Sequence, residues 1–199
     1  MSRLEQRTPA RPPARVRAGG RSERVRRHVA RACLDLLAED QLDLGPVEVA
    51  HRAGVSRATI HRWWPTKEEL LREALTLHTS VLDVPDTGTW AGDLRALATE
   101  LAAFFSDPTE VSLNAIMASG THPEFTRAVL AHYAPLFDGW RAVVERARSR
   151  GEVRADIDAD AVLLTLTAPF LVVPLLLRRT PTDDEVAQIV DLVLAATSP

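Results

Sequence analysis

The chain has 199 residues, of which 46% are hydrophobic and 26% are charged, and its formal net charge is −3. This is enough apolar material for a core and too much for a disordered chain. The densest apolar stretch, residues 161–177, contains two prolines and is shorter than the ~20 residues that span a bilayer, so we expect no membrane segment. A single cysteine excludes an internal disulfide, and no apolar block follows the N-terminal arginines, which together predict a cytoplasmic protein.

Charge is distributed unevenly along the chain. Residues 1–67 hold fourteen basic and seven acidic residues, a balance of +7, whereas residues 68–199 have a balance of −10. A basic segment favours a polyanionic partner, and an acidic one does not. The sequence therefore predicts a polyanion-binding module joined to a part with a different task.

Residues 1–21 contain six arginines, three prolines and a Gly-Gly pair without hydrophobic periodicity, and we predict a mobile arm there. A helical pattern begins at Ser22, which we expect to cap the helix. One face of this helix is marked at helical spacing by Val25, Val29, Cys33, Leu36 and Leu37.

Two short helices are predicted next, over residues 47–53 and 57–63. Gly45-Pro46 opens the first, Gly54 lies in the turn, and Ser56 caps the second. Two helices joined by a three-residue turn that contains glycine are typical of a helix-turn-helix. Ile60 and Trp64 lie four residues apart and are expected to face the core, which turns the remaining residues of the second helix outward.

A further helix is predicted from Lys67 to about Asp83, because Thr66 and Glu69 have the spacing of a capping box. Lys67 is unusual there, since a cation in the first turn opposes the helix dipole. The conflict disappears if the lysine and the helix N-terminus bind the same phosphate, and a solvated lysine is the alternative.

The rest of the chain has helical periodicity throughout, and the predicted class is all-α with about nine helices. Pro135 and Gly139 are expected to bend or interrupt the longest helix, and Gly151 to cap its end. The helices predicted in this part cover residues 91–106, 108–119, 123–149, 159–177 and 183–196.

Residues 53–67, AGVSRATIHRWWPTK, closely resemble the tetracycline-repressor (TetR) family of bacterial regulators, and the similarity extends from about Val25 to Leu71. The resemblance implies a three-helix DNA-binding head, residues 22–68, and a six-helix body for ligand binding and dimerisation, residues 69–199. Two positions depart from the family pattern. His61 replaces a tyrosine that contacts phosphate, and Gly45-Pro46 replaces a hydroxyl residue that opens the second helix.

The resemblance places the third helix of the head in the major groove of a palindromic operator. Arg57 and Arg62 can each bind guanine through two hydrogen bonds, and Ala58 is small enough to approach a thymine methyl. The hydroxyl residues, His61 and Lys67 are suited to phosphates. Trp63 lies either along the DNA backbone or in the core, and the arm either enters the minor groove or stays in solvent. The predicted DNA contacts are Ser56, Arg57, Ala58, Thr59, His61, Arg62, Trp63 and Lys67.

The body is predicted to bind an uncharged or cationic lipophilic molecule of unknown identity, through aromatic contacts and one or two polar anchors. Aromatic and methionine residues at helical spacing are also common in plain cores, and that alternative stays open for each. The candidate ligand contacts are Phe104, Asn114, Met117, Phe125, Tyr133 and Trp140.

The last two helices are too apolar for a monomer surface and predict a homodimer. The expected interface residues are Leu163, Leu166, Phe170, Val186, Ile189, Val190 and Val193, together with Leu171.

The sequence thus favours a homodimeric, ligand-responsive transcriptional regulator that acts as a repressor and needs no cofactor. A DNA-binding protein of the same fold, architectural or controlled by a protein partner, is the first alternative. A small helical enzyme is a remote one, because the chain lacks the common nucleophile, phosphate-loop and dinucleotide motifs. Its six histidines are scattered, and a metal site is not expected.

Overall fold

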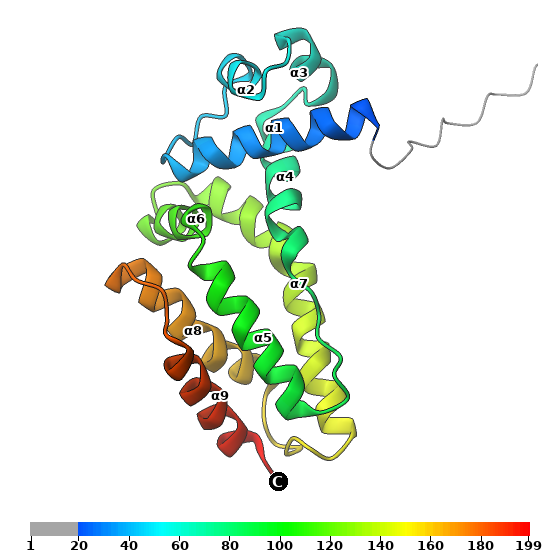
Figure 1. Ribbon diagram of the computed structural model, residues 1–199, viewed down its shortest axis with the longest axis vertical. Coiled ribbons are helices and arrows are strands. Elements are labelled where there is room, and N and C mark those ends of the chain that lie inside the picture. The colour runs from blue at the N-terminus through cyan, green and yellow to red at the C-terminus, as the bar shows by residue number, and fades with distance from the viewer. Residues whose placement is uncertain (1–19) are drawn as a thin grey trace, which may run out of the picture.

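The computed structural model describes residues 20–199, and this part of the chain contains nine α-helices, one short 3₁₀ helix and no strand (Figure 1). The predicted all-α class is confirmed. All of the predicted arm except its last two residues lies outside the described part, and Arg21 already belongs to the first helix. The elements are α1 (Arg21–Ala38), α2 (Pro46–Ala53), α3 (Arg57–Trp63), α4 (Lys67–His78), η1 (Thr79–Val81), α5 (Trp90–Phe105), α6 (Pro108–Ser119), α7 (Pro123–Ser149), α8 (Ala159–Leu177) and α9 (Asp183–Thr197).

Helices α1 to α3 form a head at one end of the molecule (Figure 1). The predicted apolar face of α1 is confirmed, because Val29, Cys33, Leu36 and Leu37 are fully buried. The predicted cap is wrong: Gly20 occupies the N-cap position without a side-chain hydrogen bond. The helix therefore begins one residue before Ser22.

The helix-turn-helix forms as predicted. Gly54 ends α2 in the left-handed conformation, with φ of 65°, which glycine adopts without strain. The Ser56 hydroxyl accepts a hydrogen bond from the Thr59 backbone N–H at 3.2 Å and caps α3. Ile60 and Trp64 are buried beneath the helix. These contacts fix the orientation of α3 on the head.

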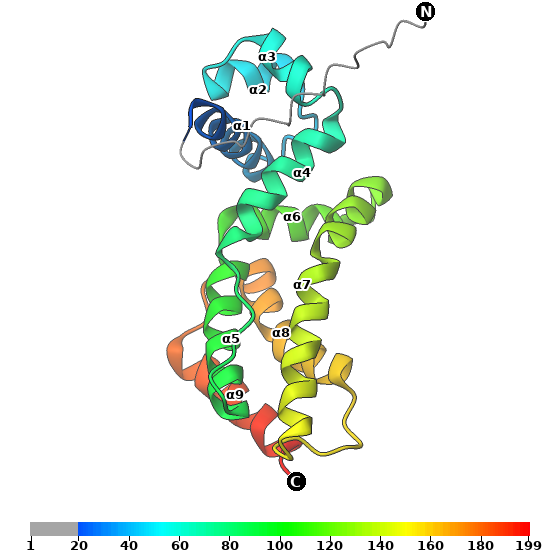
Figure 2. The same cartoon turned by 90° about the vertical axis from the view of Figure 1, so that its right-hand side faces the viewer.

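Helix α4 belongs to both parts of the molecule. The capping box between Thr66 and Glu69 is present, as predicted. The helix packs against α1 in the head and against α7 in the body (Figure 2). It ends at His78 and not near Asp83, because the chain tightens into the 3₁₀ turn η1 and then becomes extended. Any movement of α4 against the body therefore also moves the head.

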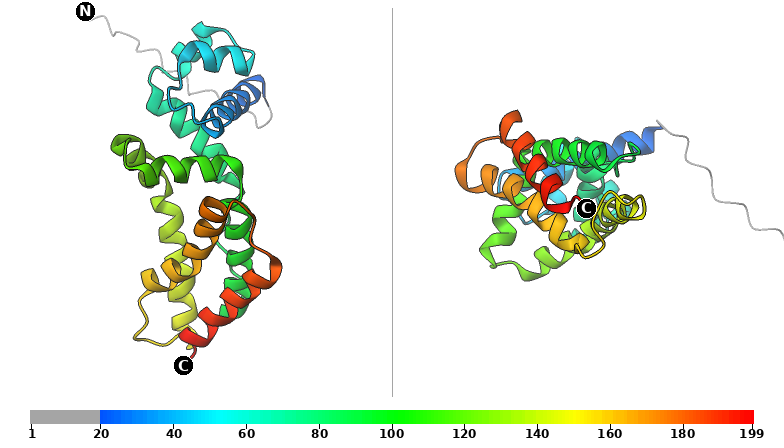
Figure 3. Two further views of the ribbon diagram at one scale, coloured as in Figure 1. Left: turned by 90° about the vertical axis from the view of Figure 1, so that its left-hand side faces the viewer. Right: turned by 90° about the horizontal axis from the view of Figure 1, so that it is seen from below.

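The body is a bundle of α5, α7, α8 and α9, and α6 lies across its upper end, beneath the head (Figures 2 and 3). Helix α7 continues through Pro135 and Gly139 without interruption. A Cβ atom at Gly139 would lie 2.7 Å from a methyl group of Val84. The glycine thus allows the extended linker after η1 to lie directly on α7.

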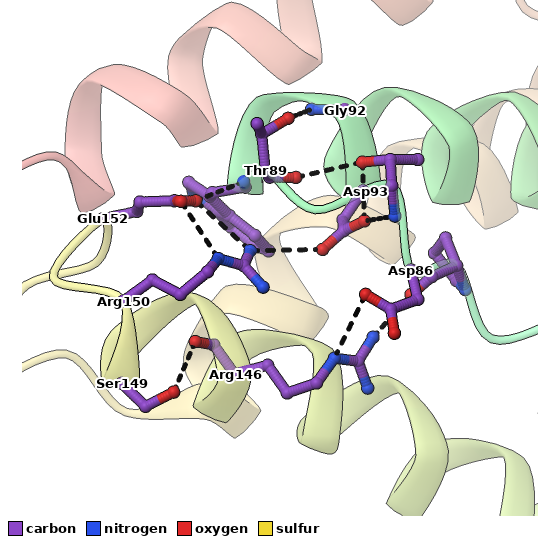
Figure 4. Close-up of polar contacts among 11 residues, drawn as sticks. Asp86, Thr89, Gly92, Asp93, Arg146, Ser149, Arg150 and Glu152 are labelled. Carbon is purple, nitrogen blue, oxygen red and sulfur yellow. Dashed lines mark hydrogen bonds and ion pairs between the residues drawn. The ribbon is translucent and has the colours of Figure 1, made fainter.

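Polar contacts close the far end of the body, as Figure 4 shows. Buried Asp93 of α5 accepts hydrogen bonds from the backbone and hydroxyl of Thr87 at 2.6 and 2.8 Å, and Arg150 approaches it at 3.4 Å. The Arg146 guanidinium at the end of α7 donates to the Pro85 carbonyl at 2.5 Å. These bonds tie the linker to α5 and α7. The indole N–H of Trp90 in α5 donates to the Thr197 hydroxyl at 2.8 Å, which also ties α9 to α5.

Candidate functional site

The outward face of α3 lies at the end of the head away from the body (Figure 1). Five of the predicted DNA contacts on or beside this helix are exposed, and Thr59 and Trp63 are partly buried. The five exposed residues carry two guanidinium groups, an imidazole, a hydroxyl and a methyl group, and no carboxylate. They are Ser56, Arg57, Ala58, His61 and Arg62.

Two of these side chains are joined on the surface. The Arg57 Nε–H donates a hydrogen bond to His61 Nε2 at 3.1 Å. The imidazole therefore accepts through Nε2, and its other nitrogen carries the hydrogen. The terminal nitrogens of Arg57 stay available, so the pair fixes the guanidinium on the face of α3 without blocking its outer edge.

The structure gives Lys67 a partner that the sequence did not predict. Its ammonium group forms an ion pair with Asp43, which precedes α2. Both side chains are largely exposed, and such surface pairs contribute little to stability. A phosphate can therefore replace the carboxylate at small cost.

The C-terminal end of α3 is fixed from below by Glu73 of α4. Trp64 donates its indole N–H to Glu73 at 3.1 Å, and Arg26 of α1 makes two hydrogen bonds to the same carboxylate at 2.9 Å. Trp63 packs against the core, with its ring centroid 5.6 Å from that of Trp64. Three helices thus meet at one carboxylate, which couples the position of α3 to α4.

A second polar cluster lies inside the protein, where α4, α6 and α7 meet. Glu110 of α6 is fully buried and accepts hydrogen bonds from Tyr133 at 2.7 Å and from the Asn114 amide at 2.7 Å. His78 Nε2 lies 3.0 Å from the same carboxylate. Burial, and then the nearby Glu110 carboxylate, raise the pKa of Tyr133 well above its usual range, so the phenol keeps its hydrogen.

This cluster contains two of the polar residues predicted as ligand anchors, Asn114 and Tyr133. Sequence reasoning missed Glu110 and His78, which hold the cluster together. One signal was available: Glu110 lies four residues before Asn114, so both occupy one face of a helix whose other residues are mainly apolar.

The predicted aromatic ligand contacts form a continuous row beside this cluster. The ring centroids of Phe104 and Tyr133 are 6.3 Å apart, and Phe137 connects Tyr133 to Trp140 at 6.3 and 5.5 Å. The Trp140 indole nitrogen is buried and has no hydrogen-bond acceptor in the described part of the chain. Met117 packs at the edge of the core.

Phe125 is not part of this row. It lines a separate groove of about 460 Å³ between the start of α4 and α7, together with Lys67.

Most of the predicted dimer residues face the interior of the protomer. Leu163, Leu166, Phe170, Val190 and Val193 are buried against the bundle, and Val186 and Ile189 are partly buried. Leu171 is also partly buried, so three of the eight expected interface residues keep some surface that a partner can contact. The apolar side chains that α8 and α9 present to solvent are Leu164, Val172, Leu176, Leu177 and Leu192.

Helix α8 is also the one helix in residues 20–199 that is long and apolar enough to cross a membrane by length and composition. The core helix of a water-soluble protein meets the same criterion, and Leu166 and Phe170 of α8 are fully buried. Within the same residues, no three His, Cys, Asp or Glu side chains are grouped to hold a metal ion.

Comparison with known proteins matches both parts of the chain to one family. A family model described as bacterial regulatory proteins of the tetR family matches residues 45–74, which include the helix-turn-helix. A second model, the tetracyclin repressor-like C-terminal domain, matches residues 84–193. The chain belongs to the TetR family. Members of this family bind operator DNA and small-molecule effectors and form dimers.

Individual TetR-family proteins resemble the chain over most of its length. The HTH-type transcriptional regulator AqdR of Rhodococcus erythropolis is 33% identical over 153 residues, which are 75% of this chain and 74% of AqdR. The TetR-family regulator SCO0332, known from a crystal structure, is 25% identical in sequence and superposes with a TM-score of 0.66. The match covers 88% of this chain and 99% of SCO0332. The flavonoid-responsive regulator FrrA has the same fold at 22% identity, with a TM-score of 0.66 and coverage of 89% and 98%.

Proposed function

We propose that this TetR-family protein is a homodimeric repressor that binds a palindromic operator through α3 and leaves it when a small lipophilic molecule binds the body. The observation that carries the proposal is the outward face of α3, which bears Arg57, His61 and Arg62 and no carboxylate. We also propose that residues 22–68 act as the DNA-binding head and residues 69–199 as the effector and dimerisation body. A cytoplasmic location agrees with this role.

The response to a ligand is supported by α4 and by the body cluster. Helix α4 packs on α1, shares Glu73 with α1 and α3, and ends at His78 beside Glu110. A ligand that changes the packing around this cluster also changes the position of α4 and so of α3. The flavonoid response named for FrrA is a precedent for such a response in this fold.

A palindromic site follows from two-fold symmetry, since two copies of α3 related by a dyad read inverted half-sites in successive major grooves. The outward apolar residues of α8 and α9 supply the contact that holds the two copies together.

Selection from random duplex DNA tests the proposal. The purified protein is expected to enrich one palindrome, and its affinity for that palindrome is expected to fall steeply as salt rises, because each phosphate contact releases counterions. If no palindrome is enriched, with or without cell extract, the proposed function is wrong.

Release by the effector has a quantitative test. A ~100-fold loss of operator affinity corresponds to about 2.7 kcal/mol of coupling, and the same factor must weaken ligand binding to the operator complex. Calorimetry with free and operator-bound protein measures both. Equal ligand affinities for the two forms would contradict release by that ligand.

A further inference from the structure

A cavity of about 360 Å³ lies where the head meets the body. Its walls come from α1, from the end of α4 with η1 and the start of the linker, and from α5. The volume falls within the range of sites that hold drug-sized molecules. Most of its lining is apolar, contributed by Leu34, Leu77, Val81, Leu82, Ala103 and Phe104.

His78 lines this cavity from one side and contacts the buried Glu110 cluster on the other. Its side chain is only 7% exposed. The hydrogen bond of its imidazole in the described part of the chain is the one between Nε2 and Glu110, which leaves Nδ1 without a partner. Nδ1 is not among the fully buried side-chain atoms that lack a partner, so a molecule in the cavity can reach it and bond to it.

The Glu110 cluster determines which hydrogen-bonding role Nδ1 has in the neutral imidazole. Tyr133 and Asn114 both donate to the Glu110 carboxylate, which acts as an acceptor. His78 Nε2 is therefore also a donor to this carboxylate, and in the neutral imidazole Nδ1 presents a lone pair. The ring is held in place by Glu110 and by a tilted contact with the Phe104 ring, with ring centroids 4.7 Å apart.

The carboxylates at the cavity wall already have partners. Glu100 accepts a hydrogen bond from the Asp83 backbone N–H at 3.2 Å, and Asp107 caps α6 through the Thr109 N–H at 2.8 Å. Arg31 lies at the exposed rim. Ser80 also lines the cavity, and its hydroxyl donates to the Leu77 carbonyl. Ser80 and Asp107 are exposed, whereas the His78 side chain is 7% exposed, so the hydrogen-bonding group on the buried side of the wall is the His78 imidazole.

We propose that this cavity binds an uncharged lipophilic molecule that carries a hydroxyl group, and that the hydroxyl donates its hydrogen bond to His78 Nδ1. The inference rests on the proposed function, for which it names the effector site and the effector's chemistry. A molecule there touches α1 of the head, α4 and α5 at once, so its binding is linked to the position of the head on the body. Glu110 acts as a positioning residue, because it fixes the ring and the tautomer of His78.

Two probes that differ in one functional group test the hydrogen bond. The hydroxyl group of 1-naphthol can donate a hydrogen bond, and the methoxy group of 1-methoxynaphthalene cannot. Calorimetry on the full-length protein is expected to give at least tenfold tighter binding of 1-naphthol. Equal affinity for the two probes, or no binding of either, would overturn the proposal, and neither result depends on a variant.

Two matched variants locate the preference. His78→Phe retains an aromatic ring but removes Nδ1, so it is expected to bind both probes with the affinity of 1-methoxynaphthalene. His132→Phe changes a neighbouring partly buried histidine that bonds to Thr79 and does not line the cavity, so the tenfold preference is expected to persist. Loss of the preference in His132→Phe but not in His78→Phe would place the site elsewhere and contradict the proposal.

Operator binding separates this inference from the proposed function. 1-Naphthol is expected to weaken binding of the wild type to the selected palindrome, and 1-methoxynaphthalene is expected to do so only at correspondingly higher concentration. If the protein binds its palindrome but neither probe, the proposed function stands and the proposed effector site is wrong. If the protein binds 1-naphthol selectively but enriches no palindrome, the proposed function is wrong.

Discussion

Arg57 illustrates how one side chain on α3 can serve recognition and orientation together. Its Nε–H bonds to His61, so the guanidinium is held before DNA arrives and loses less freedom on binding. Arg57→Ala is expected to cost about 1–3 kcal/mol on the preferred operator and to relax specificity at one base pair. Competition binding against operators with single base changes measures this.

Lys67→Ala is the matched comparison for that variant. Because Lys67 is suited to a phosphate and not to a base edge, its loss is expected to weaken binding to all sequences about equally. The slope of log affinity against log salt concentration is expected to become shallower by about one. A base-specific loss for Lys67→Ala, or a uniform loss for Arg57→Ala, would contradict the assigned roles.

Cys33 is expected to be chemically silent in the folded protein. It is fully buried in α1, and burial raises the pKa of its thiol to about 12, so almost no thiolate exists at neutral pH. A thiol reagent should react only with the unfolded state, and its rate should rise with denaturant in step with the loss of helical circular dichroism. Rapid labelling under native conditions would show that α1 separates from the head core.

At the scale of elements, the contact between the linker and α7 depends on Gly139. A methyl group there collides with Val84, and overpacking of this kind costs about 1–3 kcal/mol, against up to about 1 kcal/mol gained in helix propensity. Gly139→Ala is therefore expected to lower the free energy of unfolding.

The double variant Gly139→Ala/Val84→Ala removes the collision and retains the gain in helix propensity. It should be at least as stable as the wild type, whereas Val84→Ala alone should change little because Val84 is 41% exposed. Chemical denaturation of the four proteins gives the coupling between the two positions. Additive effects would mean that the linker does not press on α7.

Helix positions were predictable because they follow from local signals. Periodicity, capping residues and glycine turns placed α3, α6, α7 and α8 with the bounds that the structure has. The end of α4 was not predictable, since its apolar pattern continues into η1 and the linker. The Glu110 cluster and the inward faces of α8 and α9 depend on contacts between distant segments, and periodicity shows an apolar face without showing which neighbour covers it.

For the whole molecule, the outward apolar residues of α8 and α9 predict the assembly. Leu164 and Leu192 are 69% and 70% exposed in the protomer, so Leu164→Asp and Leu192→Asp should leave the fold intact and put unpaired charges at the two-fold contact. Light scattering at micromolar concentration is expected to give a dimer for the wild type and a monomer for the double variant.

Leu130→Asp is the control for these substitutions, because Leu130 of α7 is 48% exposed and lies outside α8 and α9. It should remain dimeric. A dimeric Leu164→Asp/Leu192→Asp protein, or a monomeric Leu130→Asp protein, would assign the contact to another surface.

The four tryptophans divide evenly between the two parts of the molecule, which gives the protein two built-in optical reporters. Trp63 and Trp64 lie at the end of α3, whereas Trp90 closes the far end of the body and Trp140 continues its aromatic row. Intrinsic fluorescence therefore contains one signal from the head and one from the body. Replacing either pair by phenylalanine separates them, so that thermal melts can record whether the head unfolds together with the body or before it.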